Sequence, residues 1–312
     1  MTDMPSCPFC MRPKSSRKYK FETCAIHQCS GCDLMFLHPK PSVDALSNVY
    51  DDRYFVNKQF LSSDQSHLYG YVDYIAERIN KQYGYSRIVS DIRDRLATNE
   101  ATRSPASPRW LDVGCGLGYL LDVAFDQGFA VEGIEFNPHA VQYMQSKYTY
   151  PVRCATVADM ELDKKYDVVS LMDVVEHLYD PFADLKRIRS IIADNGVLLL
   201  ITMDSGSFVS RALGSRLEDF RRIREHLFFF TRRSMKSVLA ECGFTVESVS
   251  SIGHTFALDF LLTRFALVSR PLAALLRWLI WPRWLLDANI YINPGTKMLV
   301  VARPSAPGTK AS

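Results

Sequence analysis

Four cysteines near the N-terminus have the spacing of a tetrahedral metal site. Cys7 and Cys10 form one C-x-x-C pair, and after 18 intervening residues Cys29 and Cys32 form a second. Each pair can present two thiolates to one zinc ion, with bonds of about 2.3 Å, and the spacing lies in the zinc-ribbon range. Iron would fit the same four sulfurs. A site closed by four thiolates has no open coordination position, so we expect it to serve structure or docking rather than catalysis.

The other cysteines are not needed for this site. Cys24 and His27 are spare candidates for a ligand, and we expect Cys115, Cys154 and Cys242 to be buried thiols. Because four of the eight cysteines gather in the first 32 residues, the pattern indicates metal binding in a reducing compartment rather than a disulfide framework.

A glycine-rich segment further along the chain has the features of a cofactor loop. The sequence WLDVGCGLG (110–118) places Gly114, Gly116 and Gly118 between an expected strand and an expected helix. Glycines let the backbone approach a ligand closely, and the helix N-terminus supplies N–H donors. Glu135 ends the next expected strand, 21 residues after Gly114. A carboxylate there can accept hydrogen bonds from both hydroxyls of a ribose.

The acidic residues around this loop indicate a ligand that carries positive charge. The dinucleotide fingerprint G-x-G-x-x-G is not matched, because Tyr119 stands at its third glycine position. Asp112 directly precedes the loop, where a carboxylate would repel a pyrophosphate but attract an amino group and a sulfonium. Asp173 and Glu176 follow a later strand and add acid to the same edge of the sheet. The alternative is that Asp112 and Glu135 only cap helices or turns.

Residues 109–202 resemble the class I methyltransferases that use S-adenosylmethionine. The matching motifs are LDVGCGLG, GIEFNP and YDVVSLMDVVEHLYDP, and REHLFFFTRRSMKSVLAECGF (224–244) is similar to the segment that leads into the family's sixth strand. The resemblance covers somewhat under two-thirds of the chain. It implies an α/β fold with a Rossmann-like, seven-stranded sheet whose last strand is antiparallel, here Lys297–Arg303.

The resemblance also implies S-adenosylmethionine as the cofactor and a set of residues around it. The three glycines would line the cofactor, Glu135 would bind its ribose, and the stretch Val157–Met160 would lie by the adenine, although that stretch departs from the commoner family patterns. The expected cofactor-binding residues are Asp112, Gly114, Gly116, Gly118, Glu135, Phe136, Asp159, Met160 and Asp173.

Two histidines are candidate catalytic residues. Methyl transfer is a displacement at a sulfonium methyl, in which proximity and alignment contribute most, and a general base helps only where the acceptor must lose a proton. His177 follows Glu176 at the sheet edge, and His226 lies in REHLFFF, on a segment expected to fold over the pocket. The alternative is that His177 caps the next helix and His226 is structural.

These residues need a parallel sheet to bring them together. After a polar linker (97–109), short apolar strands alternate with helical segments, which is typical of a parallel sheet covered by helices on both sides. The expected strands are 110–113, 130–134, 151–154, 166–172, 196–202, 244–250 and 298–302, and the expected helices are 118–127, 138–147, 181–192 and 231–242, with further helices around 71–79 and 88–96. The expected division of the chain is a zinc ribbon (1–40), a helical connector and linker (41–105) and a methyltransferase domain (106–312) with a helical insert (253–292).

The insert before the last strand is unusual for this family, which has a short turn there. Leu, Phe and Trp dominate residues 255–288, and Pro271 and Pro282 divide the segment into helical pieces. The arginines spaced along it are Arg264, Arg270, Arg277 and Arg283. Tryptophans with snorkelling arginines can mark a helix that lies in a membrane interface. The alternatives are a lid packed on the domain or a homodimer contact.

Composition limits the class of protein. Hydrophobic residues make up 47% and charged residues 23%, as in ordinary globular proteins, and a net charge of +3 gives little support for nucleic-acid binding. The N-terminus lacks a signal-peptide pattern, so we expect a cytoplasmic protein, with a peripheral membrane contact through the insert. The expected activity is methylation of a small-molecule, sugar or lipid-linked acceptor. The alternatives are an RNA or protein methyltransferase that uses the ribbon for recognition, and a non-catalytic scaffold.

Overall fold

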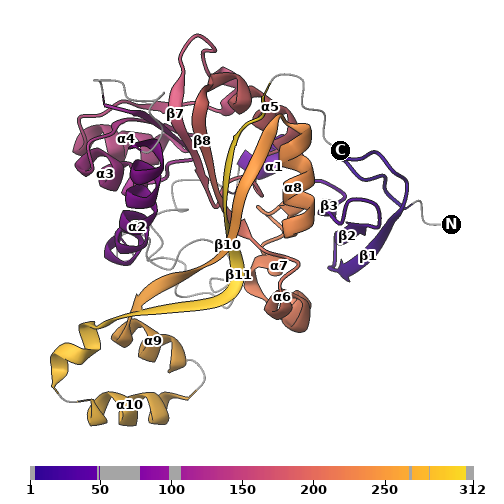
Figure 1. Cartoon of the computed structure of the whole chain (residues 1–312). Helices are drawn as coiled ribbons and strands as arrows, with labels where there is room; N and C mark the ends of the chain where they lie inside the picture. Colours follow the sequence, from indigo (N-terminus) through magenta and orange to yellow (C-terminus); the bar gives the residue numbers. More distant parts are fainter. Residues whose placement is uncertain are drawn as a thin grey trace.

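The computed structural model describes residues 4–47, 49, 78–97, 107–266, 269–280 and 282–306 (Figure 1). Its centre is one seven-stranded sheet in the order β10–β11–β8–β7–β4–β5–β6. The strands are β4 (Arg109–Val113), β5 (Ala130–Glu135), β6 (Val152–Cys154), β7 (Tyr166–Met172), β8 (Ile192–Met203), β10 (Phe244–Ala257) and β11 (Asn289–Pro304).

Strand direction in this sheet fixes where a ligand can bind. β4 pairs in parallel with β5 and β7, β5 with β6, and β7 with β8, so the carboxyl ends of five strands meet at one edge. β11 is antiparallel to both β8 and β10, with Lys297 opposite Met203. The predicted α/β fold, with a seven-stranded sheet and an antiparallel last strand, is confirmed.

Helices cover both faces of the sheet. The helices of the main body are α2 (Arg78–Ala97), α3 (Tyr119–Asp126), α4 (Pro138–Lys147), α5 (Pro181–Ile191), α6 (Phe208–Leu213), α7 (Glu218–Arg221) and α8 (Arg232–Glu241), with 3-10 turns η4 (Val157–Asp159) and η5 (Gly214–Arg216). One apolar layer joins α2, α3 and α4 to the sheet around Trp110, and the other joins α5 and α8 around Leu111. Adjacent residues of β4 thus face opposite layers, as the pleat of a strand requires.

The N-terminal segment forms a second, four-stranded sheet beside the main body. Its order is β1–β2–β3–β9, from β1 (Ser15–Lys20), β2 (Ala25–Cys29), β3 (Met35–His38) and β9 (Phe228–Phe229). β9 lies almost 200 residues further along the chain than β3, and Met35 and Phe36 pair with Phe229 and Phe228. The ribbon is therefore joined to the main body by sheet pairing, and the short helix α1 (Val43–Ser47) follows it.

The insert stands away from the rest of the molecule (Figure 1). The β10–β11 hairpin continues past the carboxyl end of β8, where Thr255 pairs with Tyr291, and carries α9 (Leu258–Phe265), α10 (Arg270–Leu279) and η6 (Arg283–Asp287) at its tip. Pro271 lies in the first turn of α10 and Pro282 precedes η6, so the prolines divide the helices as predicted. The insert does not lie over the main body as a lid would.

Two further expectations differ in detail. α2, which the sequence placed in a connector, packs on the sheet through Val89 and Ile92. Cys115 and Cys242 are buried as expected, but Cys154 is exposed at the end of β6, which is an edge strand among the described residues. The helix expected around 71–79 falls largely outside the described residues. Within the part of the chain that the structure describes, no helix is long and apolar enough to cross a bilayer.

Candidate functional site

The glycine loop turns sharply at the carboxyl end of β4. Gly114, Gly116 and Gly118 all have positive φ, which side chains rarely tolerate. A Cβ on Gly114 would lie 2.6 Å from Val174, and a Cβ on Gly118 would lie 2.4 Å from the sulfur of Met144. The loop is therefore packed closely on its neighbours and presents backbone rather than side chains to the adjacent space.

A buried hydrogen-bond chain positions Asp112 beneath this loop. Trp110 Nε1 donates to Ser170 Oγ over 2.8 Å, and Ser170 Oγ donates to Asp112 Oδ1 over 2.5 Å. Burial raises the pKa of Asp112 to about 7, the Ser170 hydroxyl opposes this rise, and the charge of Glu135 adds to it. A positive ligand beside Asp112 would favour its ionised form.

Glu135 ties the ends of two strands together. Its Oε2 accepts from the backbone N–H of Gly116 and its Oε1 from that of Asn137, both over 2.9 Å. Only 8% of the residue is exposed. Burial raises its pKa, and the two backbone donors oppose the rise. One carboxylate thus fixes the glycine loop and the turn after β5 at the same point.

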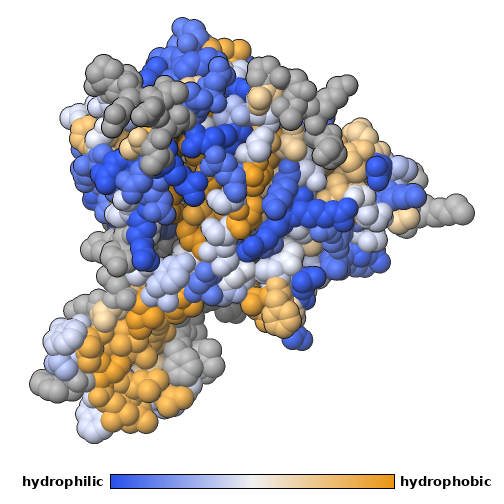
Figure 2. All heavy atoms as spheres, viewed as in Figure 1, coloured by the Kyte–Doolittle hydropathy of each residue, from blue (hydrophilic) through white to orange (hydrophobic). Residues whose placement is uncertain are grey.

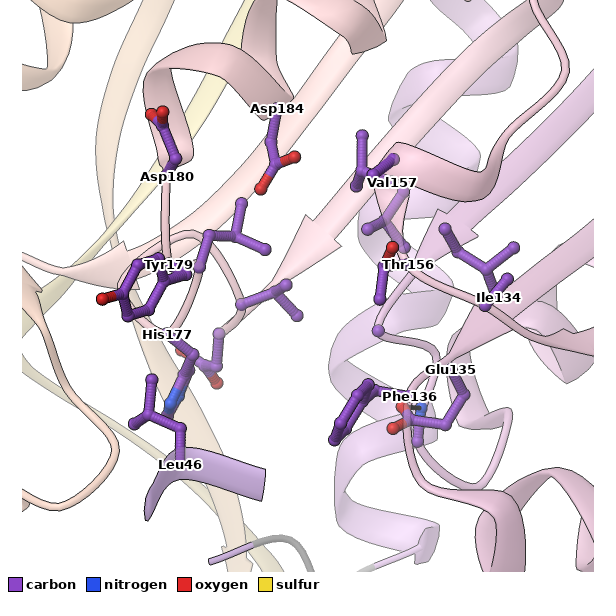
Figure 3. A pocket seen from close by; sticks show the side chains of 18 of the residues that line it. Leu46, Ile134, Glu135, Phe136, Thr156, Val157, His177, Tyr179, Asp180 and Asp184 are labelled. Carbon is purple, nitrogen blue, oxygen red and sulfur yellow. Dashed lines mark hydrogen bonds between the residues drawn. The ribbon is translucent and has the colours of Figure 1, made fainter. Parts of the chain in front are cut away.

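A cavity of about 450 Å³ opens at the carboxyl edge of β4, β5 and β7. Figure 3 shows Ile134, Glu135, Phe136, Thr156 and Val157 on one side and His177, Tyr179, Asp180 and Asp184 on the other. Gly114, Gly116 and Asp173 also line it, and Val43 and Leu46 of α1 contribute apolar surface. The cavity therefore combines apolar walls with acidic groups on opposite sides, as a cationic ligand with an aromatic base requires.

Beside the cavity, three ligand-type side chains from distant segments meet. Glu176, His177 and His226 offer donor atoms that all lie within 4.8 Å of one another. The two imidazoles meet edge to face, with ring centroids 4.7 Å apart. Burial lowers the pKa of both histidines, that of His226 well below its usual value. Both rings are therefore neutral at pH 7.

Asp173 begins the turn that carries these groups. It has a positive φ of 56°, uncommon for a non-glycine residue and often found at functional sites. Its Oδ1 lies 2.6 Å from Nζ of Lys297, the residue of β11 opposite the end of β8. Burial raises the pKa of Glu176 to about 8, and the charge of Asp173 adds to this effect.

The sequence profile of a family described as "Methyltransferase domain" matches residues 80–249, more than half of the chain. The chain belongs to this methyltransferase family. This places it in the class I, S-adenosylmethionine-dependent methyltransferase family, as its motifs indicated.

Curated relatives match a shorter region of the methyltransferase. The ubiquinone biosynthesis O-methyltransferase of Rhodopseudomonas palustris (strain HaA2) is 33% identical over 101 residues, which are 31% of this chain and 40% of that protein. The protein of the same name from Xanthomonas axonopodis pv. citri (strain 306) is 31% identical over 117 residues, 35% of this chain and 49% of that protein. The chain thus spans under half the length of these relatives. The solved plantazolicin methyltransferase BpumL, in complex with SAH, covers 84% of this chain and 95% of its own with 13% identity and a TM-score of 0.49.

The methyltransferase brings most of the expected cofactor residues together. Gly114, Gly116, Glu135, Phe136 and Asp173 line the cavity. The other four do not line it: Asp112 is buried under the loop, Gly118 precedes α3, Asp159 is exposed and accepts from Thr156 at η4, and Met160 is packed in the core. Where Asp159 and Met160 were expected, residues 155–158 form the wall instead.

The expected catalytic histidines differ in position. His177 lines the cavity. His226 does not, and it is only 2% exposed, because the REHLFFF segment is held against the ribbon by β9 rather than folded over the pocket.

The sequence analysis did not single out several residues at or beside the cavity. Tyr179, Asp180 and Asp184 belong to the loop after β7 and the first turn of α5, and Lys297 reaches the site from the last strand. The motif YDVVSLMDVVEHLYDP contains the first two, so its full length was a usable signal. Lys297 gave no local signal, because its role depends on the pairing of β11 with β8.

The four cysteines of the ribbon converge on one point. Cys7 Sγ lies 3.6 Å from Cys32 Sγ, and Cys10 Sγ lies 3.5 Å from Cys29 Sγ. Sulfurs bound to one tetrahedral ion with bonds of about 2.3 Å are separated by about 3.8 Å, so the cluster fits a zinc ion closely. Cys24 and His27 lie outside the cluster, and His27 stacks on Phe36 instead.

Proposed function

We propose that this methyltransferase transfers a methyl group to an oxygen atom of a small-molecule, sugar or lipid-linked acceptor. Bound S-adenosylmethionine would supply the methyl group, carried on a sulfonium. The supporting observation is the cavity. Glu135 lies on one wall, and His177 lies on the other with Tyr179, Asp180 and Asp184. The curated relatives are named as O-methyltransferases of ubiquinone biosynthesis, which supports an oxygen acceptor and an apolar substrate.

Each wall of the cavity has a separate role in this proposal. Glu135 accepts hydrogen bonds from the ribose hydroxyls, while its existing contact with Gly116 keeps the glycine loop in place. Asp112 and Asp173 supply negative charge toward the amino group and the sulfonium. His177, on the opposite wall, lies where an acceptor would enter. Alignment of the acceptor oxygen with the methyl group is the main contribution expected of the protein.

We also propose zinc in the ribbon. The short distances between the four sulfurs support a metal that holds this segment folded. Because β3 pairs with β9, an ordered ribbon also keeps the segment that carries His226 in place.

The insert is proposed to dock on an anionic membrane surface that holds the acceptor. Its apolar side chains face solvent: Trp278 is 74% and Trp284 66% exposed, and Figure 2 shows a continuous hydrophobic surface over this part of the molecule. Exposed Arg270 and Arg283 flank it, so the positive charge complements anionic headgroups. The β10–β11 hairpin extends from the carboxyl edge of β8, the same edge that carries the cavity.

Liposome co-sedimentation tests this docking. The protein is expected to sediment with vesicles that contain anionic lipid at low salt, and the double substitution Trp278→Ala and Trp284→Ala should reduce the bound fraction several-fold. Phe125→Ala, which removes an exposed aromatic ring from α3, is the matched control and should have no effect. A protein that stays in the supernatant while forming a stable dimer would assign the apolar face to a second copy of the chain and contradict the proposal.

The cofactor assignment is tested by calorimetry with Glu135→Gln. Loss of the charged acceptor for buried ribose hydroxyls should weaken S-adenosylmethionine binding by about 1–3 kcal/mol, roughly 5- to 150-fold. Glu161→Gln, at an exposed position, should bind as the parent does. Unchanged affinity in Glu135→Gln would contradict the role of this carboxylate. The acceptor is identified by mass spectrometry of cell extract incubated with the protein and methyl-labelled cofactor. The absence of a labelled O-methyl product would count against the proposed acceptor class.

A further inference from the structure

A second set of metal-ligand residues lies apart from the cysteine ribbon. Glu176 and His177 come from the turn after β7, and His226 comes from the segment before β9, 49 residues later. Their donor atoms lie within 4.8 Å of one another. Two imidazoles and one carboxylate form a ligand set that divalent first-row transition metals accept, and three protein ligands leave positions open for water or a substrate oxygen.

The Nδ1 atom of each imidazole has a backbone carbonyl partner, as in many metal-binding histidines. Nδ1 of His177 lies 3.1 Å from the carbonyl oxygen of Glu225, and Nδ1 of His226 lies 3.0 Å from that of Asp219. Because a carbonyl oxygen only accepts, each Nδ1 carries the proton and each Nε2 carries the lone pair. Proteins commonly fix the tautomer and direction of a histidine ligand in this way.

Glu176 has one carboxyl oxygen that is buried without a hydrogen-bond partner among the described residues. It is 2% exposed, and its Oε2 has no hydrogen-bond partner among the described residues, a costly arrangement for a buried carboxylate. The nearby cations pair with other acids: Lys297 with Asp173 over 2.6 Å and Arg222 with Glu225 over 2.7 Å. The buried Oε2 of Glu176 is therefore available to a bound cation, whose charge would favour the ionised carboxylate.

We propose that Glu176, His177 and His226 bind one divalent transition-metal ion at the wall of the cofactor cavity. His177 lines the cavity and His226 does not, so His226 cannot act on an acceptor as a direct base but can hold an ion together with His177. The open positions of the ion face the cavity and bind an oxygen of the acceptor. That last part rests on the proposed O-methylation, whereas the binding of the ion does not.

Binding of Mn²⁺ and Zn²⁺ to the full-length protein tests the site without an activity assay. Mn²⁺ prefers oxygen ligands to the thiolates that select zinc, so it separates this site from the ribbon. With the ribbon loaded with zinc, calorimetry and electron paramagnetic resonance should find one Mn²⁺ per chain, and excess Zn²⁺ should fill a second site. His226→Gln and Glu176→Gln should each lower the affinity at this site at least tenfold. His139→Gln, an exposed histidine on α4, should bind as the parent does.

Separate measurements distinguish the possible failures. Calorimetry with S-adenosylmethionine shows whether each variant is folded, since retained cofactor affinity with lost metal affinity places the defect at the metal site. The proposal would be overturned if neither Mn²⁺ nor excess Zn²⁺ binds to the protein once the ribbon holds zinc. Equal Mn²⁺ affinity in His226→Gln and the parent protein would also overturn it. Metal binding without any O-methylated product would leave the site standing and refute the acceptor class instead.

Discussion

The four cysteines and the Glu176, His177 and His226 cluster are both built from metal-ligand residues, but they differ in how far they are closed. The cysteine sulfurs lie 3.5–3.6 Å apart in two pairs, near the spacing that one tetrahedral ion imposes. The second cluster has three ligand residues rather than four, with donor atoms within 4.8 Å of one another, and it adjoins a cavity through His177. The first arrangement suits a structural role, and the second leaves room for a substrate atom.

The two clusters are also connected through the backbone. Leu37 in β3 donates its N–H to the carbonyl oxygen of Leu227, and Leu227 donates its own N–H to the carbonyl oxygen of Glu176, both over 2.9 Å. The ribbon therefore braces the segment that carries His226 and the turn that carries Glu176. A closed cluster can in this way position an open one without contacting the substrate.

The largest effect is expected from Cys29→Ser. Loss of one of four thiolates should remove zinc from the ribbon, because metal binding contributes on the order of 10 kcal/mol to the folding of such small domains. Elemental analysis should fall from one zinc per chain to none, and hydrogen exchange should rise across residues 5–40. Cys24→Ser, a cysteine outside the cluster, should keep its zinc and its protection. A Cys29→Ser protein that retains a full equivalent of metal would show that the cysteines are not the ligands.

Loss of zinc from the ribbon should lower metal affinity at the second cluster, whereas loss of a ligand from the second cluster should not affect the ribbon. In Cys29→Ser the pairing of β3 with β9 is weakened, so Mn²⁺ affinity at the second cluster should fall about 10- to 100-fold, as for other losses of support behind a ligand. His226→Gln, in contrast, should leave the zinc content of the ribbon unchanged. If His226→Gln also loses zinc by elemental analysis, as Cys29→Ser loses Mn²⁺ affinity by calorimetry, the two clusters form one cooperative unit and the ribbon is not a one-way support.

Residues whose role depends on nearby sequence could be predicted from it. The glycine loop, Glu135 and the cysteine pairs each combine a spacing with a strand or turn that the same few residues encode, and the buried strands appear as apolar runs. Strand positions followed from these local patterns, and the antiparallel direction of the last strand followed from the family resemblance. Pro271 and Pro282 likewise located the helix boundaries of the insert.

Contacts that depend on long-range pairing could not be predicted. His226 meets His177 only because a two-residue strand, Phe228–Phe229, pairs with the distant β3, and so short a strand has no periodicity to detect. Glu176 was identified only as additional acid at the sheet edge. Its missing hydrogen-bond partner becomes visible only when the surrounding side chains are in place.

The smallest effect should come from Lys297, a cation whose charge acts on the second cluster. Its Nζ lies 2.6 Å from Oδ1 of Asp173, so it neutralises an acid at the cavity and repels any ion that binds beside it. Removing one nearby positive charge in Lys297→Met should raise Mn²⁺ affinity by on the order of 1 kcal/mol, about fivefold, since the site is only partly shielded from solvent. Lys236→Met, at an exposed position of α8, should leave the affinity unchanged. A fall in Mn²⁺ affinity in Lys297→Met, measured by the same calorimetry, would mean that this lysine holds Asp173 and its turn in place and that its charge is not the dominant influence on the ion.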